Sequence, residues 1–127
     1  MEKQTIEQES KILHRVGPSL NLMVQAVDKL QAMKKADLRA GDWVCVKTRN
    51  SVYTIRVLGN GKYAVSGGWF DRKGLSPMIT PVAGCTWGGS AIKIDIVAAC
   101  GLRIEFGNRL ITSTIQKIFF LPYGCEN

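Results

Sequence analysis

Histidine is almost absent from this chain of 127 residues, which contains only His14, and its four cysteines include no C-x-x-C pair. Zinc fingers and ribbons need closely spaced ligand pairs, and a nucleophilic serine or cysteine usually needs a nearby base. The acidic residues are scattered, and no two of them stand out as a general acid and base. We therefore predict no enzyme, no cofactor and no metal site, and we expect the cysteines to be mostly buried and reduced.

Long apolar runs without charges are also missing. Residues 1–15 are polar and charged, and they lack the apolar core of a signal peptide. The most apolar later stretch, residues 91–106, contains Lys93, Asp95, Arg103 and Glu105, and these charges exclude a membrane span. The sequence therefore predicts a cytoplasmic protein that does not use a membrane as its partner.

Acidic residues are outnumbered, since ten of them stand against 17 Lys and Arg and leave a formal net charge of +7. Such a charge favours an anionic partner only if the basic side chains lie together. The candidate face consists of basic residues with an aromatic residue among them: Lys47, Arg49, Arg56, Lys62, Trp69, Arg72 and Lys73. Basic side chains that hold phosphates and rings that stack on bases are what binding of single-stranded nucleic acid requires. The alternative is a solvated sheet face without a ligand.

The chain divides into a polar arm at 1–18, one domain at 19–122 and a tail at 123–127. The domain begins after the helix breaker Gly17-Pro18 with a predicted amphipathic helix from about Ser19 to Ala36. Its apolar stripe consists of Leu20, Met23, Val27 and Leu30. This stripe either packs on the sheet of its own domain or forms a surface for self-association.

Period-two alternation over residues 43–66 predicts a three-stranded antiparallel meander. The expected turns are Asn50-Ser51 and Asn60-Gly61, of which Asn-Gly is the stronger hairpin signal. Lys47 and Arg49 share one face of the first strand, and we expect Arg56 to lie across the hairpin from them.

Residues 67–91 are rich in glycine, with a possible strand near Met78–Val82, and the alternation resumes over residues 92–96 and 102–106. A hairpin is expected at Gly107-Asn108, a single 3₁₀ turn within residues 113–118 and a last strand over 118–121. The predicted fold is mainly β: a small antiparallel SH3-like barrel or roll of about six strands, with one N-terminal amphipathic helix.

The segment Cys85–Ser90, CTWGGS, has two interpretations. Successive amides around its glycines would form an anion-binding nest, or the glycines would let the sheet bend at a corner. The lysine and the spacing of a phosphate loop are missing, which favours the corner.

Two resemblances follow from these patterns. A helical turn before the last strand, after a meander, resembles SH3-like barrels, and an N-terminal helix on such a barrel resembles the Sm-like RNA-binding fold. The strings TRNSVY at 48–53, Gly67-Gly68 and TSTI at 112–115 resemble an uncharacterised family of small bacterial proteins. That family implies no activity.

These observations together predict a non-catalytic binding or assembly module whose partner is another protein or a second copy of itself. The alternative function is the binding of single-stranded RNA or DNA by the basic sheet face.

Overall fold

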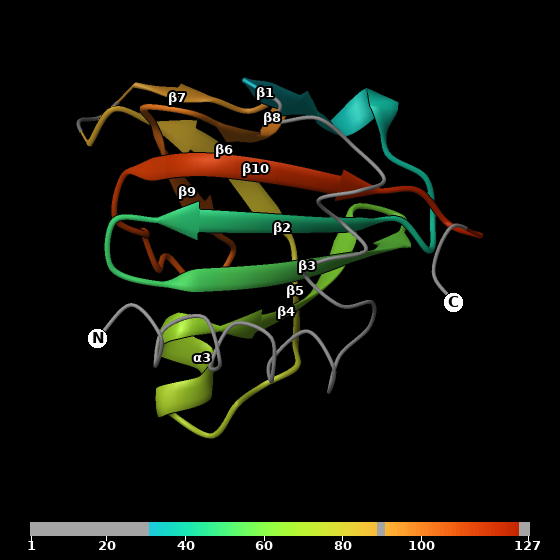
Figure 1. Ribbon diagram of the computed structural model, residues 1–127, viewed down its shortest axis with the longest axis horizontal. Helices are drawn as coiled ribbons and strands as arrows, with labels where there is room; N and C mark the ends of the chain where they lie inside the picture. Colours follow the sequence, from blue (N-terminus) through green and yellow to red (C-terminus); the bar gives the residue numbers. More distant parts are fainter. Residues whose placement is uncertain (1–30, 89–90, 125–127) are drawn as a thin grey trace.

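The computed structural model describes residues 31–88 and 91–124, in which antiparallel strands form three sheets (Figure 1). The largest sheet has five strands, in the order β10 (Ile115–Leu121), β2 (Trp43–Thr48), β3 (Val52–Gly59), β4 (Lys62–Gly67) and β5 (Met78–Thr80). The second has the order β7 (Ile92–Lys93), β6 (Val82–Thr86) and β9 (Arg103–Phe106). The third pairs β1 (Ala32–Lys34) with β8 (Ile96–Ala99). The described part of the protein is therefore mainly β.

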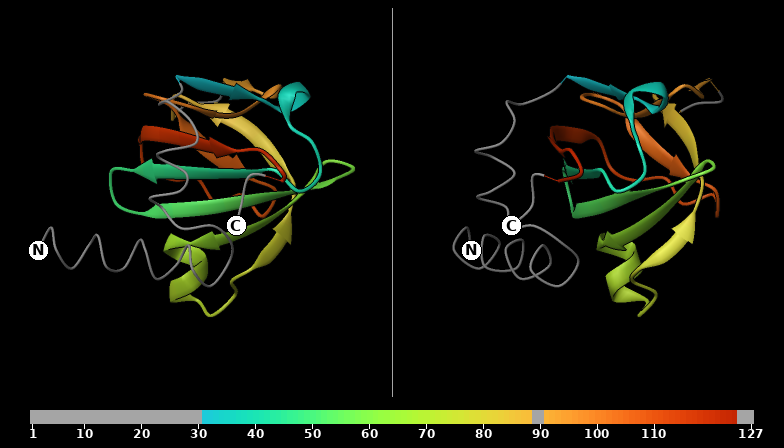
Figure 2. Two further views of the ribbon diagram at one scale, coloured as in Figure 1. Left: turned by 45° about the vertical axis from the view of Figure 1, so that its right-hand side comes forward. Right: turned by 90° about the vertical axis from the view of Figure 1, so that its right-hand side faces the viewer.

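Short helical segments complete the described chain: the 3₁₀ helix η1 (Lys35–Asp37) and the helix α3 (Gly68–Arg72). Figures 1 and 2 show α3 beyond β4 and β5, at the opposite end of the molecule from β1, β7 and β8. None of the helices in residues 31–88 and 91–124 is long and apolar enough to cross a membrane.

The predicted meander over residues 43–66 is confirmed as β2, β3 and β4. Asn60 and Gly61 both adopt positive φ, +55° and +74°, as the type I′ turn requires. The first turn differs from the expectation, because Asn50 does not have the left-handed backbone of Asn60. The Thr48 side chain closes this turn instead: the Ser51 N–H donates to Thr48 Oγ1 over 3.1 Å.

The predicted helix extends too far at its C-terminal end. Ala32–Lys34 is the strand β1, in which Met33 is buried between two exposed neighbours, and η1 follows it. Pairing with β8 explains this outcome, because tertiary contacts override a helical pattern in so short a segment. Residues 1–30 lie outside the described residues, and with them the polar arm and the stripe of Leu20, Met23, Val27 and Leu30.

The expected 3₁₀ turn within residues 113–118 is wrong, because Ile115–Leu121 is one strand, β10. Ile115 pairs with Thr48 and Lys117 with Lys47, so Gln116 is an extra residue in a β-bulge. The bulge lets Ile115 and Ile118, three residues apart, both enter the core. The helical turn that suggested an SH3-like barrel is therefore absent, and the described strands pair into three sheets rather than one closed barrel.

The second half of the chain forms more and shorter strands than its alternation predicts. Residues 92–96 form two strands, because a turn at 94–95 exposes Ile94 between β7 and β8. The strand expected near Met78–Val82 is split at Pro81, which has no N–H for a ladder and separates β5 from β6. The hairpin expected at Gly107-Asn108 is present, and the left-handed residue in it is Arg109.

One hydrophobic core joins the sheets, and three aromatic rings lie within it. Tyr53 of β3, Phe70 of α3 and Phe106 of β9 have ring centroids 5.2 to 6.1 Å apart. The contacts of Phe70 with the other two rings are edge-to-face, and such contacts add about 0.5–1.5 kcal/mol per pair to the burial of the rings. A second, smaller cluster lies on the other face of the five-stranded sheet.

Gly67 allows the main chain to turn from β4 into α3. Its φ is +101°, and an added Cβ would collide with the Val52 carbonyl oxygen on β3. Gly61 also has a positive φ, but nothing lies within 4 Å of an added Cβ there.

We expect Gly67→Ala to lower the free energy of unfolding by more than about 3 kcal/mol, because strain and a backbone collision add together. Gly61→Ala is the matched control, with an expected loss of about 1 kcal/mol from strain alone. Urea denaturation of both variants measures the difference, and equal losses would contradict the collision.

Candidate anion-binding pocket

The strings TRNS and TSTI, more than 60 residues apart in the sequence, lie against each other in the structure. Ser113 Oγ donates to Thr48 Oγ1 over 2.8 Å, and the Asn50 N–H donates to Ser113 Oγ over 3.0 Å. The Arg49 N–H donates to the Thr114 carbonyl over 2.8 Å. These bonds hold the β2–β3 turn against the segment that leads into β10.

The neighbouring strand β9 holds that segment from the other side. The Ile104 N–H donates to Thr112 Oγ1 over 3.1 Å, and the Thr112 N–H donates to the Ile104 carbonyl over 2.9 Å. Thr112 Oγ1 in turn donates to the Ser113 carbonyl over 2.8 Å. Thr112 is buried, so the backbone at 112–114 is fixed before any ligand binds.

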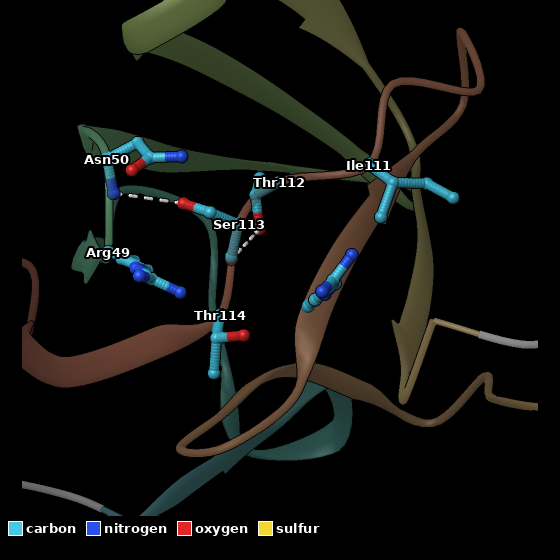
Figure 3. A pocket seen from close by; sticks show the side chains of 7 residues that line it. Arg49, Asn50, Ile111, Thr112, Ser113 and Thr114 are labelled. Atoms are coloured by element: carbon cyan, nitrogen blue, oxygen red, sulfur yellow. Dashed lines mark hydrogen bonds between the residues drawn. The ribbon is translucent and has the colours of Figure 1, made fainter.

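A pocket of about 450 Å³ opens where these segments meet. Its lining residues are Arg49, Asn50, Arg103, Ile111, Thr112, Ser113 and Thr114. Figure 3 shows Arg49 and Asn50 on one side, Ile111 on the other, and the residues 112–114 between them. The pocket therefore takes its walls from the turn after β2, the start of β9 and the segment before β10.

Positive charge without a counter-charge characterises this pocket. Arg49 and Arg103 line it, and the lining contains no carboxylate, imidazole or thiol. Within residues 31–88 and 91–124, neither guanidinium is engaged in an ion pair. Guanidinium groups bind carboxylate or phosphate oxygens through two parallel N–H donors. The arrangement can hold an anion, whereas its lining residues offer no base for proton transfer.

The CTWGGS segment borders the same region through Gly88. A Cβ added there would lie 3.7 Å from Cζ of Arg103, and Arg103 pairs with Thr86 across the strands. The Gly88 N–H donates to Thr86 Oγ1 over 3.1 Å, so this amide of the expected nest is already used. Gly89 and Ser90 lie outside the described residues.

The predicted basic face is divided in the structure. Lys47 lies opposite Val52 and Lys117, while Arg56 lies opposite Trp43. Arg56 is therefore four residues along β3 from the position facing Lys47, about 13 Å, and the expected placement is wrong. The guanidinium of Arg56 lies instead over the Trp43 ring, 5.4 Å from its centroid.

The other members of the face lie at different ends of the fold. Lys62 begins β4, whereas Arg72 and Lys73 follow the opposite end of that strand, about 17 Å away along it. Trp69 is half-buried, and its ring meets Phe70 edge-on at 5.3 Å. Of the seven candidate residues, only Arg49 lines the pocket.

Two of the scattered aspartates have structural roles. Asp42 is buried and accepts the N–H groups of Arg39 and Tyr123 over 2.7 and 2.9 Å. Asp71 accepts the N–H of Gly67 over 3.0 Å, which fixes the start of α3. No group of three or more potential ligands in the described ranges could hold a metal ion.

Known proteins give no direct guide to this pocket. Comparison of the chain with protein-family models, with curated proteins and with solved structures finds no match. The pocket must therefore be understood from its own chemistry.

Ser113→Ala removes the hydroxyl that connects the two strings, leaving the Asn50 N–H without its acceptor. We expect a loss of about 1–2 kcal/mol in the free energy of unfolding. Thr114→Ala is the control, because its hydroxyl makes no hydrogen bond within the described residues, and its effect should stay within about 0.5 kcal/mol. Denaturation curves for the two variants test this difference; indistinguishable curves would show that the Ser113 contact contributes nothing.

Proposed function

We propose that this protein is a non-catalytic binding module that holds an anionic group in the pocket between the TRNS turn and the TSTI segment. The observation that carries the proposal is the presence of Arg49 and Arg103 in one pocket whose lining contains no acid. An unpaired positive charge is the usual reason for an anion to bind, and the preformed backbone lowers the ordering cost.

The ligand class follows from the donors in the pocket. Arg49, Arg103 and the Asn50 amide supply N–H donors, and the Thr114 hydroxyl supplies an O–H. Carboxylate and phosphate groups both match this set, with phosphate offering more acceptor oxygens. Ile111 adds an apolar wall that is 45% exposed, suited to the carbon skeleton that carries the anion.

Several broader predictions belong to the same proposal. The scaffold is an SH3-like roll, supported by one core shared between three sheets. The protein belongs to the uncharacterised bacterial family with the TRNSVY and TSTI strings, and it works in the cytoplasm. Its anionic group is carried by a protein partner, or by a second copy of the chain in a homo-oligomer.

A second function, binding of single-stranded nucleic acid, is favoured by one exposed aromatic residue. Trp87 is 60% exposed, and the Lys93 ammonium lies 5.9 Å from its ring centroid. Gly88, the next residue, borders Arg103 in the pocket. A ring for stacking beside a cation for phosphate is the usual combination in such sites. This group differs from the basic face predicted from the sequence, whose aromatic member, Trp69, is half-buried.

The proposed function predicts that inorganic phosphate shifts the amide resonances of Asn50, Ser113 and Thr114 in an NMR titration at low ionic strength. Arg103→Gln should weaken this binding by about tenfold or more, because a charge-assisted contact is lost. Arg72→Gln, at the exposed end of α3, removes the same charge and should leave the affinity unchanged. Equal weakening by both variants would mean a diffuse charge effect and no pocket.

Fluorescence anisotropy with labelled single-stranded RNA and DNA tests the second function at low and physiological salt. Nucleic acid held by this protein should dissociate steeply as salt rises, because counterions are released on binding. Trp87→Ala should then reduce the affinity more than a triple Gln variant of Lys47, Arg49 and Arg56 if the exposed ring is the platform. Loss in the triple variant alone would assign binding to the sheet face.

A further inference from the structure

Three hydrogen-bond acceptors in the wall of the pocket already have donors. Ser113 Oγ accepts the Asn50 N–H over 3.0 Å, and the Ser113 carbonyl accepts the Thr112 hydroxyl over 2.8 Å. The Thr114 carbonyl accepts the Arg49 N–H over 2.8 Å. A ligand that brings donors of its own, such as an ammonium group or a polyol, therefore finds few acceptors here.

The donors of the same wall are still available. The main-chain N–H groups of Ser113 and Thr114 make no hydrogen bond to any group in residues 31–88 and 91–124. In the same part of the chain, the Asn50 side-chain amide and the Thr114 hydroxyl make none either. Figure 3 shows the Ser113 hydroxyl directed toward Asn50 and the Thr114 hydroxyl directed away from it. The wall is therefore complementary to a ligand that has many acceptors and few donors.

The charge of the pocket narrows the ligand further. Arg49 and Arg103 line it, while Glu105, the carboxylate that pairs with Ile111, does not. A carboxylate or a phosphodiester carries one negative charge and would leave one guanidinium without a counter-charge. A phosphomonoester carries close to two negative charges at pH 7, and its three terminal oxygens can accept from both guanidinium groups and from the main chain.

The size of the pocket leaves room for the group that carries the phosphate. Its volume of about 450 Å³ lies within the range of about 300–1,000 Å³ that is typical of small-molecule sites. Ile111 supplies an apolar part of the lining and is 45% exposed. A bare phosphate ion makes no use of this side chain, whereas the carbon atoms of an ester can pack against it.

We propose that the pocket selects a phosphomonoester in its doubly charged form, the chemistry shared by a phosphorylated protein side chain and a free nucleotide. This inference rests on the anion-binding function proposed above and narrows the ligand from anions in general to one class. Arg49 and Arg103 neutralise the two charges, the donors of Ser113 and Thr114 hold the remaining oxygen, and Ile111 contacts the carrier.

NMR titrations at low ionic strength test the selection by charge. Methyl phosphate is compared with dimethyl phosphate and acetate, which each carry a single charge. We expect methyl phosphate to bind about tenfold or more tightly than either, because both guanidinium groups then have a charged partner. Arg49→Gln and Arg103→Gln should each reduce this preference to about threefold or less, since one charged contact is lost. Arg72→Gln is the matched control and should leave the preference unchanged.

The pH dependence of binding identifies the charge state of the ligand. A phosphomonoester gains a proton near pH 6, so its doubly charged fraction falls about tenfold between about pH 7.5 and about pH 5. We expect the affinity for methyl phosphate to fall by about the same factor. Dimethyl phosphate keeps its charge over this range and is the control for titration of the protein itself.

The protein side chains around the pocket do not account for such a change. Its lining contains no carboxylate, imidazole or thiol. The titratable side chains on β2, β3, β6, β9 and β10 all lie outside the lining: Cys45, Lys47, Tyr53, Cys85, Glu105 and Lys117. Carboxyl groups ordinarily titrate below this pH range, and thiol, phenol and ammonium groups titrate above it.

A phosphoserine peptide with blocked ends and uridine 5′-monophosphate distinguish the two sources of the phosphate. The unphosphorylated peptide and uridine are their controls and should not bind. Tighter binding of either phosphorylated probe than of methyl phosphate supports the proposal and identifies the carrier.

Two outcomes would overturn the proposal and leave the anion-binding function intact. In the first, dimethyl phosphate or acetate binds as tightly as methyl phosphate does. In the second, the affinity for methyl phosphate is the same at both pH values. Failure of the anion-binding function itself looks different, because none of the anions would then shift the resonances of the pocket residues.

Discussion

Packing in one hydrophobic core, which contains three aromatic rings in contact, holds the described sheets together, because these sheets share few backbone hydrogen bonds. Tyr53 belongs to the five-stranded sheet, Phe106 to the three-stranded sheet and Phe70 to the helix between β4 and β5. Side-chain packing therefore sets how one sheet lies on the other. The pocket depends on that packing, since one wall follows β2 and another begins β9.

Hydroxyl groups connect the backbone segments of the pocket, as aromatic rings connect the sheets in the core. Thr48, Thr112 and Ser113 are short side chains whose hydrogen bonds run between backbone segments distant in sequence. Their positions leave the longer side chains of Arg49 and Arg103 to face the open space. Loops held in this way combine a fixed backbone with adjustable charged ends, a common arrangement in binding proteins.

The local parts of the fold could be predicted, whereas features that depend on distant partners could not. Alternation and an Asn-Gly pair suffice for the meander, because both act between neighbouring residues. In β2 both faces are buried, and alternation alone does not reveal that Trp43 and Cys45 are covered on the side of Lys47. Arg103 carried no local signal for a site. It lines the same pocket as Arg49 only because the TSTI segment, noticed for its resemblance, lies against TRNS.

The bulge at Gln116 has a consequence for how this chain can change in evolution. Because a strand alternates its faces at every residue, the extra residue decides that Ile118 points into the main core and Phe119 away from it. Removing one residue between Ser113 and Ile118 would exchange the two sets. Related sequences should therefore keep the length of this segment constant even where its residues vary, while the exposed turn at Gly107-Asn108 can accept insertions.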